Sequence, residues 1–442
     1  MGLKDRVQNK VVRHLFGIER RNAKRKKSER RRIRSGKTHV IEYFHDASDP
    51  YSHLVAQVLP VFVDRYNIDL EVHLVAPPPD WAAPDRDRLH FNSRRDAVRL
   101  AERAGLEFND PGAQPIELAL LAANSELLKA KQSGTFITRA QEIGRQLWNA
   151  GDFETPTYSA EVVQSALTTS AERREKLGHY LGGTLYYAGE WYWGIDRLHF
   201  LEQRLKELGA ANNTDAPLIF DPPNVPSGGS EIDAPNRPEL HWYLSFRSPY
   251  TGIVADRVKS LAEAYNADLK LRYVLPMVMR GMQVPRMKGF YIMSDTAREA
   301  ERQNIPFGNL FDPVGEPVER GYAILHRAIE LGRGFEFVQS FLSGVWSEGL
   351  NARIDRDLRT ITERSGLPWN DMKQLIGQDH WRAEAEANQQ EMFSHGIWGV
   401  PSFRVGDVAT WGQDRLWVVE DALKAVAQGN RIDWRNQDGS DQ

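Results

Sequence analysis

The fold is decided by residues 240–251, which read LHWYLSFRSPYT. The aromatic and aliphatic run over 240–244 predicts a strand. Ser248-Pro249 predicts the start of a helix, because proline lacks an N–H that would be unpaired in the first turn anyway. A helix is expected over 253–265 and a second strand over 269–275. Strand, helix and strand in this order predict a right-handed parallel unit.

The same pattern occurs earlier in the chain. Residues 43–108 align without a gap on residues 242–307 at a constant offset of 199 positions. In this alignment Asp49-Pro50-Tyr51-Ser52 falls on Ser248-Pro249-Tyr250-Thr251. We interpret the match as a duplication. Two copies are too few for a repeat array, so the 442 residues predict two globular domains in tandem.

The middle of each copy predicts helices, and its end predicts a hairpin. In the second copy the helices are expected over 293–303, 321–331, 335–349, 354–365, 369–376 and 380–395. Two strands over 402–405 and 408–411 meet at the Gly406-Asp407 turn, and a closing helix covers 413–428. This order predicts the α/β class and two tandem thioredoxin-like domains, each with a helical insertion.

Composition sets the boundaries between these parts. Residues 211–239 contain six prolines and the pair Gly228-Gly229, as linkers do. We predict a basic leader over 1–38, a first domain over 39–210, a linker over 211–239, a second domain over 240–430 and a polar tail over 431–442.

The amino-acid composition excludes several classes of protein. The chain has no cysteine, which rules out disulfides, a protein thiol nucleophile and thiolate metal sites. No window is long and apolar enough for a membrane span, and no apolar run follows the basic N-terminus as in a secretory signal. We expect a cytoplasmic protein.

The leader carries most of the positive charge. Residues 1–37 hold fifteen Lys or Arg against three acids, which leaves the rest of the chain with a net charge of about −15. Two interpretations remain open. The leader is a solvated, partly helical tail, or it binds an anionic surface such as lipid or nucleic acid.

Three motifs of the second copy carry a resemblance to a known family. They are Ser248-Pro249-Tyr250-Thr251, Gly399-Val400-Pro401-Ser402-Phe403 and Trp411-Gly412-Gln413-Asp414-Arg415. In this order they resemble 2-hydroxychromene-2-carboxylate isomerases and kappa-class glutathione transferases, which belong to the DsbA-like branch of the thioredoxin fold. The resemblance covers 240–428 and, more weakly, 39–208. It implies a glutathione-dependent isomerase or transferase acting on an aromatic or electrophilic small molecule.

Ser248 is the predicted catalytic residue. As a helix N-cap it places a hydroxyl beside the positive end of the helix dipole, where an external anion is stabilised. The resemblance implies that this anion is the thiolate of glutathione, the cosubstrate. The alternative is a cap that only begins the helix. Because the chain has no thiol, disulfide exchange of the DsbA type is excluded despite the shared fold.

Six further residues are implied to contact glutathione by the resemblance: Pro249, Tyr250, Val400, Pro401, Gln413 and Asp414. It implies a cis Val400–Pro401 bond facing Ser248, with the backbone of Val400 paired to the cysteinyl part of glutathione. Asp414 would receive the ammonium group of the γ-glutamyl end. The alternative for Asp414 is helix capping.

The pocket of the second substrate is predicted around Lys288, Arg280 and Trp398. A methionine-rich segment with basic residues suits an aromatic carboxylate, although methionine also fills gaps in a core. The histidines are scattered without metal-ligand spacing, so we predict no metal.

The first copy departs from the pattern where the chemistry is expected. Asp49 stands in the place of Ser248, and Thr184 in the place of Pro401. A carboxylate would repel a thiolate, so we interpret the first domain as a degenerate, built-in partner. Asp49 as a general base for a different reaction is the alternative. For the whole chain, the alternative is a non-catalytic thioredoxin-fold scaffold or binding protein with a basic targeting leader.

Overall fold

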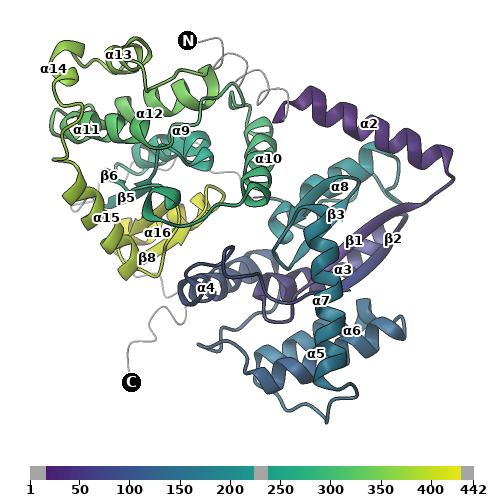
Figure 1. Cartoon of the computed structure of the whole chain (residues 1–442). Coiled ribbons are helices and arrows are strands. Elements are labelled where there is room, and N and C mark those ends of the chain that lie inside the picture. The colour runs from purple at the N-terminus through teal and green to yellow at the C-terminus, as the bar shows by residue number, and fades with distance from the viewer. Residues whose placement is uncertain (1–15, 223–236, 430–442) are drawn as a thin grey trace. The chain divides into compact units, whose positions relative to one another are not determined.

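The computed structural model describes residues 16–222 and 237–429 and divides into two compact halves (Figure 1). Residues 23–222 form the first half, and residues 237–429, with which 16–22 are grouped, form the second. Each half contains a four-stranded mixed sheet, in the orders β2-β1-β3-β4 and β6-β5-β7-β8. In both sheets the first strand pairs in parallel with the second and antiparallel with the third. The predicted α/β class with two thioredoxin-like domains is confirmed.

The elements follow the same order in both halves. Helix α2 (Ile18–Arg34) precedes the first sheet. The first half then contains β1 (His39–His45), α3 (Pro50–Arg65), β2 (Ile68–Leu74), α4 (Arg86–Ala104), α5 (Glu117–Gln132), α6 (Phe136–Trp148), α7 (Ala160–Leu177), β3 (Thr184–Tyr187), β4 (Glu190–Trp193), η1 (Ile195–Arg197) and α8 (Leu198–Glu207).

The second half begins at a strand and ends at a helix in the same way. It contains β5 (Glu239–Leu244), α9 (Pro249–Ala264), β6 (Asp268–Tyr273), η2 (Met277–Arg280), α10 (Arg286–Arg302), α11 (Glu316–Glu330), α12 (Gly334–Ser343), η3 (Gly344–Glu348), α13 (Asp355–Arg364), α14 (Trp369–Lys373), α15 (Arg382–Ser394), β7 (Ser402–Val405), β8 (Val408–Trp411) and α16 (Leu416–Ala427). The helical insertion of each half lies between its second and third strands.

Several helix predictions differ from the structure. Helix α11 starts at Glu316 rather than at 321, and α14 ends at Lys373 rather than at 376. Helix α10 starts at Arg286 rather than at 293, because Pro285 directly precedes its first turn and the Met-Lys-Gly-Phe-Tyr segment continues it. The helix expected over 335–349 ends as an α-helix at Ser343 and continues as the π-helical turn η3.

The side chains of β5 alternate between the two faces of the sheet. Trp242 is fully buried and contacts Phe335 at the start of α12. On the other face, Tyr243 packs with Met392 of α15. Helices therefore cover both faces of the second sheet, and each face of β5 has its own core.

Two buried hydrogen bonds are repeated in the halves. The Tyr265 hydroxyl donates to Glu420 at 2.6 Å, and the Tyr66 hydroxyl donates to Glu202 at 3.0 Å. Each pair joins the end of the helix after the first strand to the last helix of its half. Their presence in both halves indicates that they hold the fold together.

Parts of the predicted leader and linker are described. Residues 211–222 contact the first half: Phe220 is buried, and the Ile219 N–H donates to Glu202. Residues 1–15 of the leader, 223–236 of the linker and 430–442 with the predicted tail lie outside the described residues. Within the described ranges, no helix is long and apolar enough to cross a membrane.

Candidate active site of the second half

Ser248 caps helix α9, as the sequence predicts. Its hydroxyl oxygen accepts the N–H of Thr251 at 3.2 Å, and Pro249 occupies the first turn. The side chain is half-buried. The positive end of the α9 dipole therefore lies beside a hydroxyl that remains partly accessible.

The Val400–Pro401 peptide bond is cis, as the resemblance implied. The Ser248 hydroxyl donates to the Val400 carbonyl at 3.2 Å, so residues 152 positions apart meet at this point. Among the described residues, no protein group accepts the Val400 N–H. A Cβ on Gly399 would lie 2.3 Å from the Trp411 ring, so glycine is needed for the loop to pack this closely.

Tyr250 lies in the first turn of α9, and its hydroxyl is engaged in an internal contact. It donates to Asp295 at 2.8 Å, and the Arg298 guanidinium donates to the other oxygen of the same carboxylate at 2.9 Å. The first half repeats the first contact, with Tyr51 donating to Asp96 at 2.8 Å. The Tyr250 hydroxyl thus positions α10 against α9, and its predicted contact with glutathione stays a prediction.

Gln413 and Asp414 follow β8, and their side chains differ in accessibility. Gln413 is 1% exposed, and its side-chain oxygen accepts a hydrogen bond from Arg257 of α9 at 2.5 Å. Asp414 has a side chain that is 19% exposed and is paired with Arg415 at 3.2 Å. Of the two, Asp414 presents the more accessible polar group for the predicted γ-glutamyl contact.

The three residues of the predicted second pocket lie together. The Lys288 ammonium is 5.7 Å from the centre of the Trp398 ring, and the Arg280 guanidinium donates to the Trp398 carbonyl at 3.4 Å. Burial lowers the pKa of Lys288 to about 8 and that of Arg280 to about 10. The Nε and Nη1 atoms of Arg280 are buried without a hydrogen-bond partner among the described residues. Trp398 is 2% exposed and Lys288 9% exposed, so the three residues form a buried cationic group, and their contact with a second substrate stays a prediction.

The methionines of this region are only partly buried. None of them belongs to the fully buried core, and η2 has no buried residue. They are Met277, Met279, Met282, Met287 and Met293. Their partial exposure favours a pocket wall over core filling.

The first half fills the corresponding place with acidic groups. The Asp49 carboxylate caps α3 by accepting the N–H groups of Tyr51 and Ser52 at 3.3 and 3.0 Å. Burial and, second, the nearby Asp46 carboxylate raise the pKa of Asp49 to about 7. The strand registers correct one part of the alignment: Thr184 corresponds to Ser402, so Gly183 stands in the place of Pro401. A Cβ on Gly183 would lie 3.0 Å from the Asp49 carboxylate, so the loop before Thr184 packs directly onto it.

One cluster of acidic and histidine side chains in the first half was not predicted from the sequence. Among the described residues, Glu42, Glu71 and His73 have ligand atoms within 4.8 Å of one another, although the sequence predicted no metal-ligand group. Glu71 and His73 are two apart on β2 and so share a face, which is the signal that spacing could have provided. Arg173 donates to both carboxylate oxygens of Glu42 at 2.9 Å, so a metal ion would have to displace this guanidinium.

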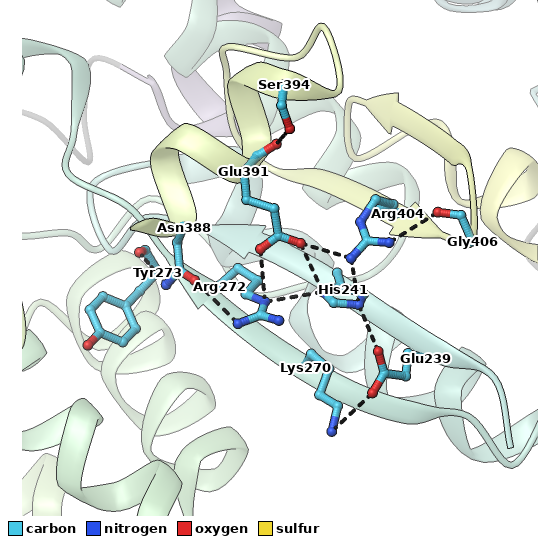
Figure 2. A network of polar contacts seen from close by, with 10 residues as sticks. All are labelled: Glu239, His241, Lys270, Arg272, Tyr273, Asn388, Glu391, Ser394, Arg404 and Gly406. Carbon is cyan, nitrogen blue, oxygen red and sulfur yellow. Dashed lines mark hydrogen bonds and ion pairs between the residues drawn. The ribbon is translucent and has the colours of Figure 1, made fainter. Parts of the chain in front are cut away.

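The second half has a polar network on the corresponding face of its sheet (Figure 2). Glu391 of α15 accepts a hydrogen bond from Arg404 at 2.8 Å and lies 3.5 Å from Arg272 and 3.6 Å from His241. His241 is buried, and burial together with the guanidinium groups of Arg404 and Arg272 lowers its pKa. The network joins α15 to three strands, so we assign it to the fold rather than to the chemistry.

Comparison with known proteins agrees with this geometry. Residues 239–424 match the family model of the DSBA-like thioredoxin domain. The chain is 22% identical over 193 residues to a 2-hydroxychromene-2-carboxylate isomerase of Pseudomonas sp. (strain C18), which covers 42% of this chain and 89% of the relative. The isomerase of Pseudomonas putida is 20% identical over 199 residues, covering 43% of this chain and 97% of the relative.

Two solved structures match parts of this chain at low similarity. A structure of 2-hydroxychromene-2-carboxylate isomerase has a TM-score of 0.37 at 21% identity and covers 43% of this chain and 96% of its own. The cytosolic disulfide reductase DsbM of Pseudomonas aeruginosa has a TM-score of 0.33 at 17% identity, with 43% and 97% covered. By its sheet order, its cis-proline loop and its match to the family model, the second half of this chain has the DsbA-like thioredoxin fold.

Proposed function

We propose that the second half is a glutathione-dependent isomerase or transferase that acts on an aromatic or electrophilic small molecule, with Ser248 holding the thiolate. One observation carries the proposal. The Ser248 hydroxyl and the Val400 carbonyl meet 3.2 Å apart at the N-terminus of α9, beside an N–H that no described protein group accepts. A thiol compound with a peptide backbone fits these three groups together.

Glutathione binding would replace the hydrogen bond between the Ser248 hydroxyl and the Val400 carbonyl with hydrogen bonds to the ligand. The cysteinyl N–H of glutathione would donate to the Val400 carbonyl, and its C=O would accept the Val400 N–H. The Ser248 hydroxyl, displaced from the carbonyl, would then donate its hydrogen to the sulfur. Together with the α9 dipole this favours the thiolate, and the thiol proton leaves to solvent.

The thiolate would then act as a nucleophile. Its sulfur forms a bond to an electrophilic carbon of a conjugated substrate, and the carbon–carbon double bond becomes a single bond that can rotate. When the carbon–sulfur bond breaks again, the double bond reforms and the product is an isomer. When the adduct instead takes up a proton and keeps the sulfur, the product is a conjugate.

The substrate would bind by an anionic group near Trp398. Lys288 and Arg280 supply the charge, and the partly exposed methionines supply an adaptable apolar wall. The first half has Leu89 and Trp81 at the positions aligned with Lys288 and Arg280. It therefore lacks the cations as well as the serine.

The pKa of the bound thiol tests the role of Ser248. We expect the ultraviolet absorbance of the thiolate to titrate below the pKa of about 8.5 that is usual for a free thiol. Ser248→Ala removes a charge-assisted hydrogen bond and should raise the pKa of the bound thiol by about one unit or more. Ser248→Thr keeps a hydroxyl and is the matched control. An unchanged thiol pKa in the alanine variant would contradict the proposal.

A further inference from the structure

Helix α2 has two faces that differ in how their charges are used. It spans Ile18–Arg34 and has no fully buried residue. On one face, Arg25 donates two hydrogen bonds to Glu190 of β4, at 2.6 and 2.7 Å, and both side chains are largely covered. On the same face Arg32 pairs with Glu29 at 2.6 Å and donates to the Lys37 carbonyl at 2.9 Å. This face attaches the helix to the first half.

The other face carries a row of cations. At the usual helical turn of about 100° per residue, Lys24, Lys27, Arg31 and Arg34 lie within an arc of about 80°, roughly opposite Arg25. All four are exposed. No hydrogen bond or ion pair joins the side chain of any of them to another described residue. We call these four residues the basic stripe; from Lys24 to Arg34 it is about 15 Å long.

The stability of α2 accounts for only two of the four cations in the basic stripe. Arg31 and Arg34 lie in the last turn, where cations complement the negative end of the helix dipole. Lys24 and Lys27 lie in the middle of the helix, where the dipole gives no such benefit. Residues 38–442 carry a net charge of about −15, so these exposed lysines do not belong to a generally basic surface.

The side chains of the basic stripe limit its partner. A helix held along one side by a protein domain can still lie in the major groove of DNA, where base edges are read by amide and hydroxyl side chains as well as by Arg and Lys. The basic stripe has no amide or hydroxyl side chain. A flat anionic surface needs only one accessible face. The stripe contains no apolar residue, so its contact with such a surface would rest on charge without insertion.

We propose that the basic stripe of α2 is a docking surface for an anionic lipid headgroup layer. Each cation near such a surface strengthens binding about fivefold, so four cations give a measurable but reversible attachment. The attachment would be screened by salt, because all four charges are exposed.

Vesicle sedimentation of the full chain tests the proposal. The probes are vesicles with about one third phosphatidylserine in phosphatidylcholine, and phosphatidylcholine vesicles alone. We expect binding only to the anionic vesicles, weakened at least tenfold by Lys24→Glu/Lys27→Glu, since each cation contributes about fivefold. Glutamate is a good helix former, so α2 should persist, which circular dichroism checks. The matched control is Lys129→Glu/Lys176→Glu, which makes the same charge change on exposed positions of the first half.

Three results would overturn the proposal. The first is equal loss of binding in the stripe and control variants, because net charge would then explain the effect. The second is unchanged binding in the stripe variant. The third is tighter binding to duplex DNA than to anionic vesicles at the same ionic strength, which would assign the stripe to a nucleic acid instead.

Discussion

In both halves, ion pairs join a helix to the same face of the sheet, but the acidic and basic partners are exchanged between helix and strand. In the first half Glu42 on β1 receives Arg173 from α7. In the second half the aligned residue is His241, and with Arg272 and Arg404 it surrounds Glu391 from α15 (Figure 2). The helix before the hairpin is thus attached to the central strands in both halves, although the charges are exchanged. Because this contact between helix and strands is present in both halves with its charges exchanged, we assign it to the stability of the fold.

The helix N-termini of the two halves keep the same structural role but differ in chemistry. Asp49 and Ser248 both cap their helices, so the structural role is preserved. The chemistry is not preserved, because the Ser248 hydroxyl can donate to a thiolate, whereas Asp49, whose pKa is raised to about 7, becomes a carboxylate that repels a thiolate as pH rises through that value. Residues that differ without changing the fold are therefore the ones on which the functional proposal depends.

The largest effect is expected from filling the tight loops of both halves. Gly399→Ala would place a Cβ 2.3 Å from Trp411, and Gly182→Ala would place one 2.4 Å from Asp46. Each should lower the free energy of unfolding of its half by about 1–3 kcal/mol, measured by denaturant melts. Gly289→Ala, in open space on α10, is the control and should be neutral or slightly stabilising. A neutral result for only one loop would show that the halves pack differently there.

The exchanged ion pairs should differ in strength. Glu391→Gln leaves the cations around it without a counter-charge and should cost about 1–3 kcal/mol of unfolding free energy. Arg173 has a side chain that is 49% exposed, so Arg173→Gln should cost less than about 1 kcal/mol. Urea melts followed by circular dichroism measure both variants. Equal costs would contradict the view that the second network is the more deeply coupled one.

The acidic cap of the first half predicts a dependence of stability on pH. The pKa of Asp49 is raised to about 7, whereas an unfolded aspartate titrates near 3.9. Between these values the folded chain holds more protons, so stability should fall as pH rises from about 4 to about 7. Asp49→Asn should reduce this slope in thermal melts, while Asp414→Asn should not. A slope that Asp49→Asn leaves unchanged would assign the dependence to other groups.

The smallest effect is expected at the second pocket. The pKa of Lys288 is lowered to about 8 by burial, so its positive charge is lost as pH rises through that value. For an anionic substrate the KM should therefore rise several-fold above about pH 8. Lys288→Met should remove this rise, whereas Lys259→Met, on the exposed side of α9, should keep it. Unaltered pH dependence in the Lys288 variant would remove Lys288 from the substrate site.

Local signals made much of the fold predictable. The Gly406-Asp407 turn gave both strands of the last hairpin their observed limits, and Ser248-Pro249 located the start of α9. The start of α10 was missed by seven residues, because Gly289 lies in its first turns and its N-cap residue, Pro285, makes no side-chain cap hydrogen bond. Helix propensity and caps act over a few residues, so predictions resting on them were the accurate ones.

Contacts between distant residues could not be read from the sequence in the same way. The juxtaposition of Ser248 with Val400 came from a resemblance and not from spacing. The engagement of Gln413 with Arg257 and the grouping of Glu42 with His73 were not foreseen, since both depend on how a helix or strand packs against its neighbours. Only the tertiary structure decides which of several polar groups is accessible to a ligand.

Calorimetric titration with glutathione is the most direct test of whether the second half binds glutathione at Ser248. We expect one binding event per chain, weakened about tenfold or more by Ser248→Ala and unaffected by Asp49→Ala. Two events per chain, or a loss of binding in the Asp49 variant, would contradict the assignment of the site to the second half. No binding by a folded chain would contradict the glutathione proposal itself and favour a scaffold.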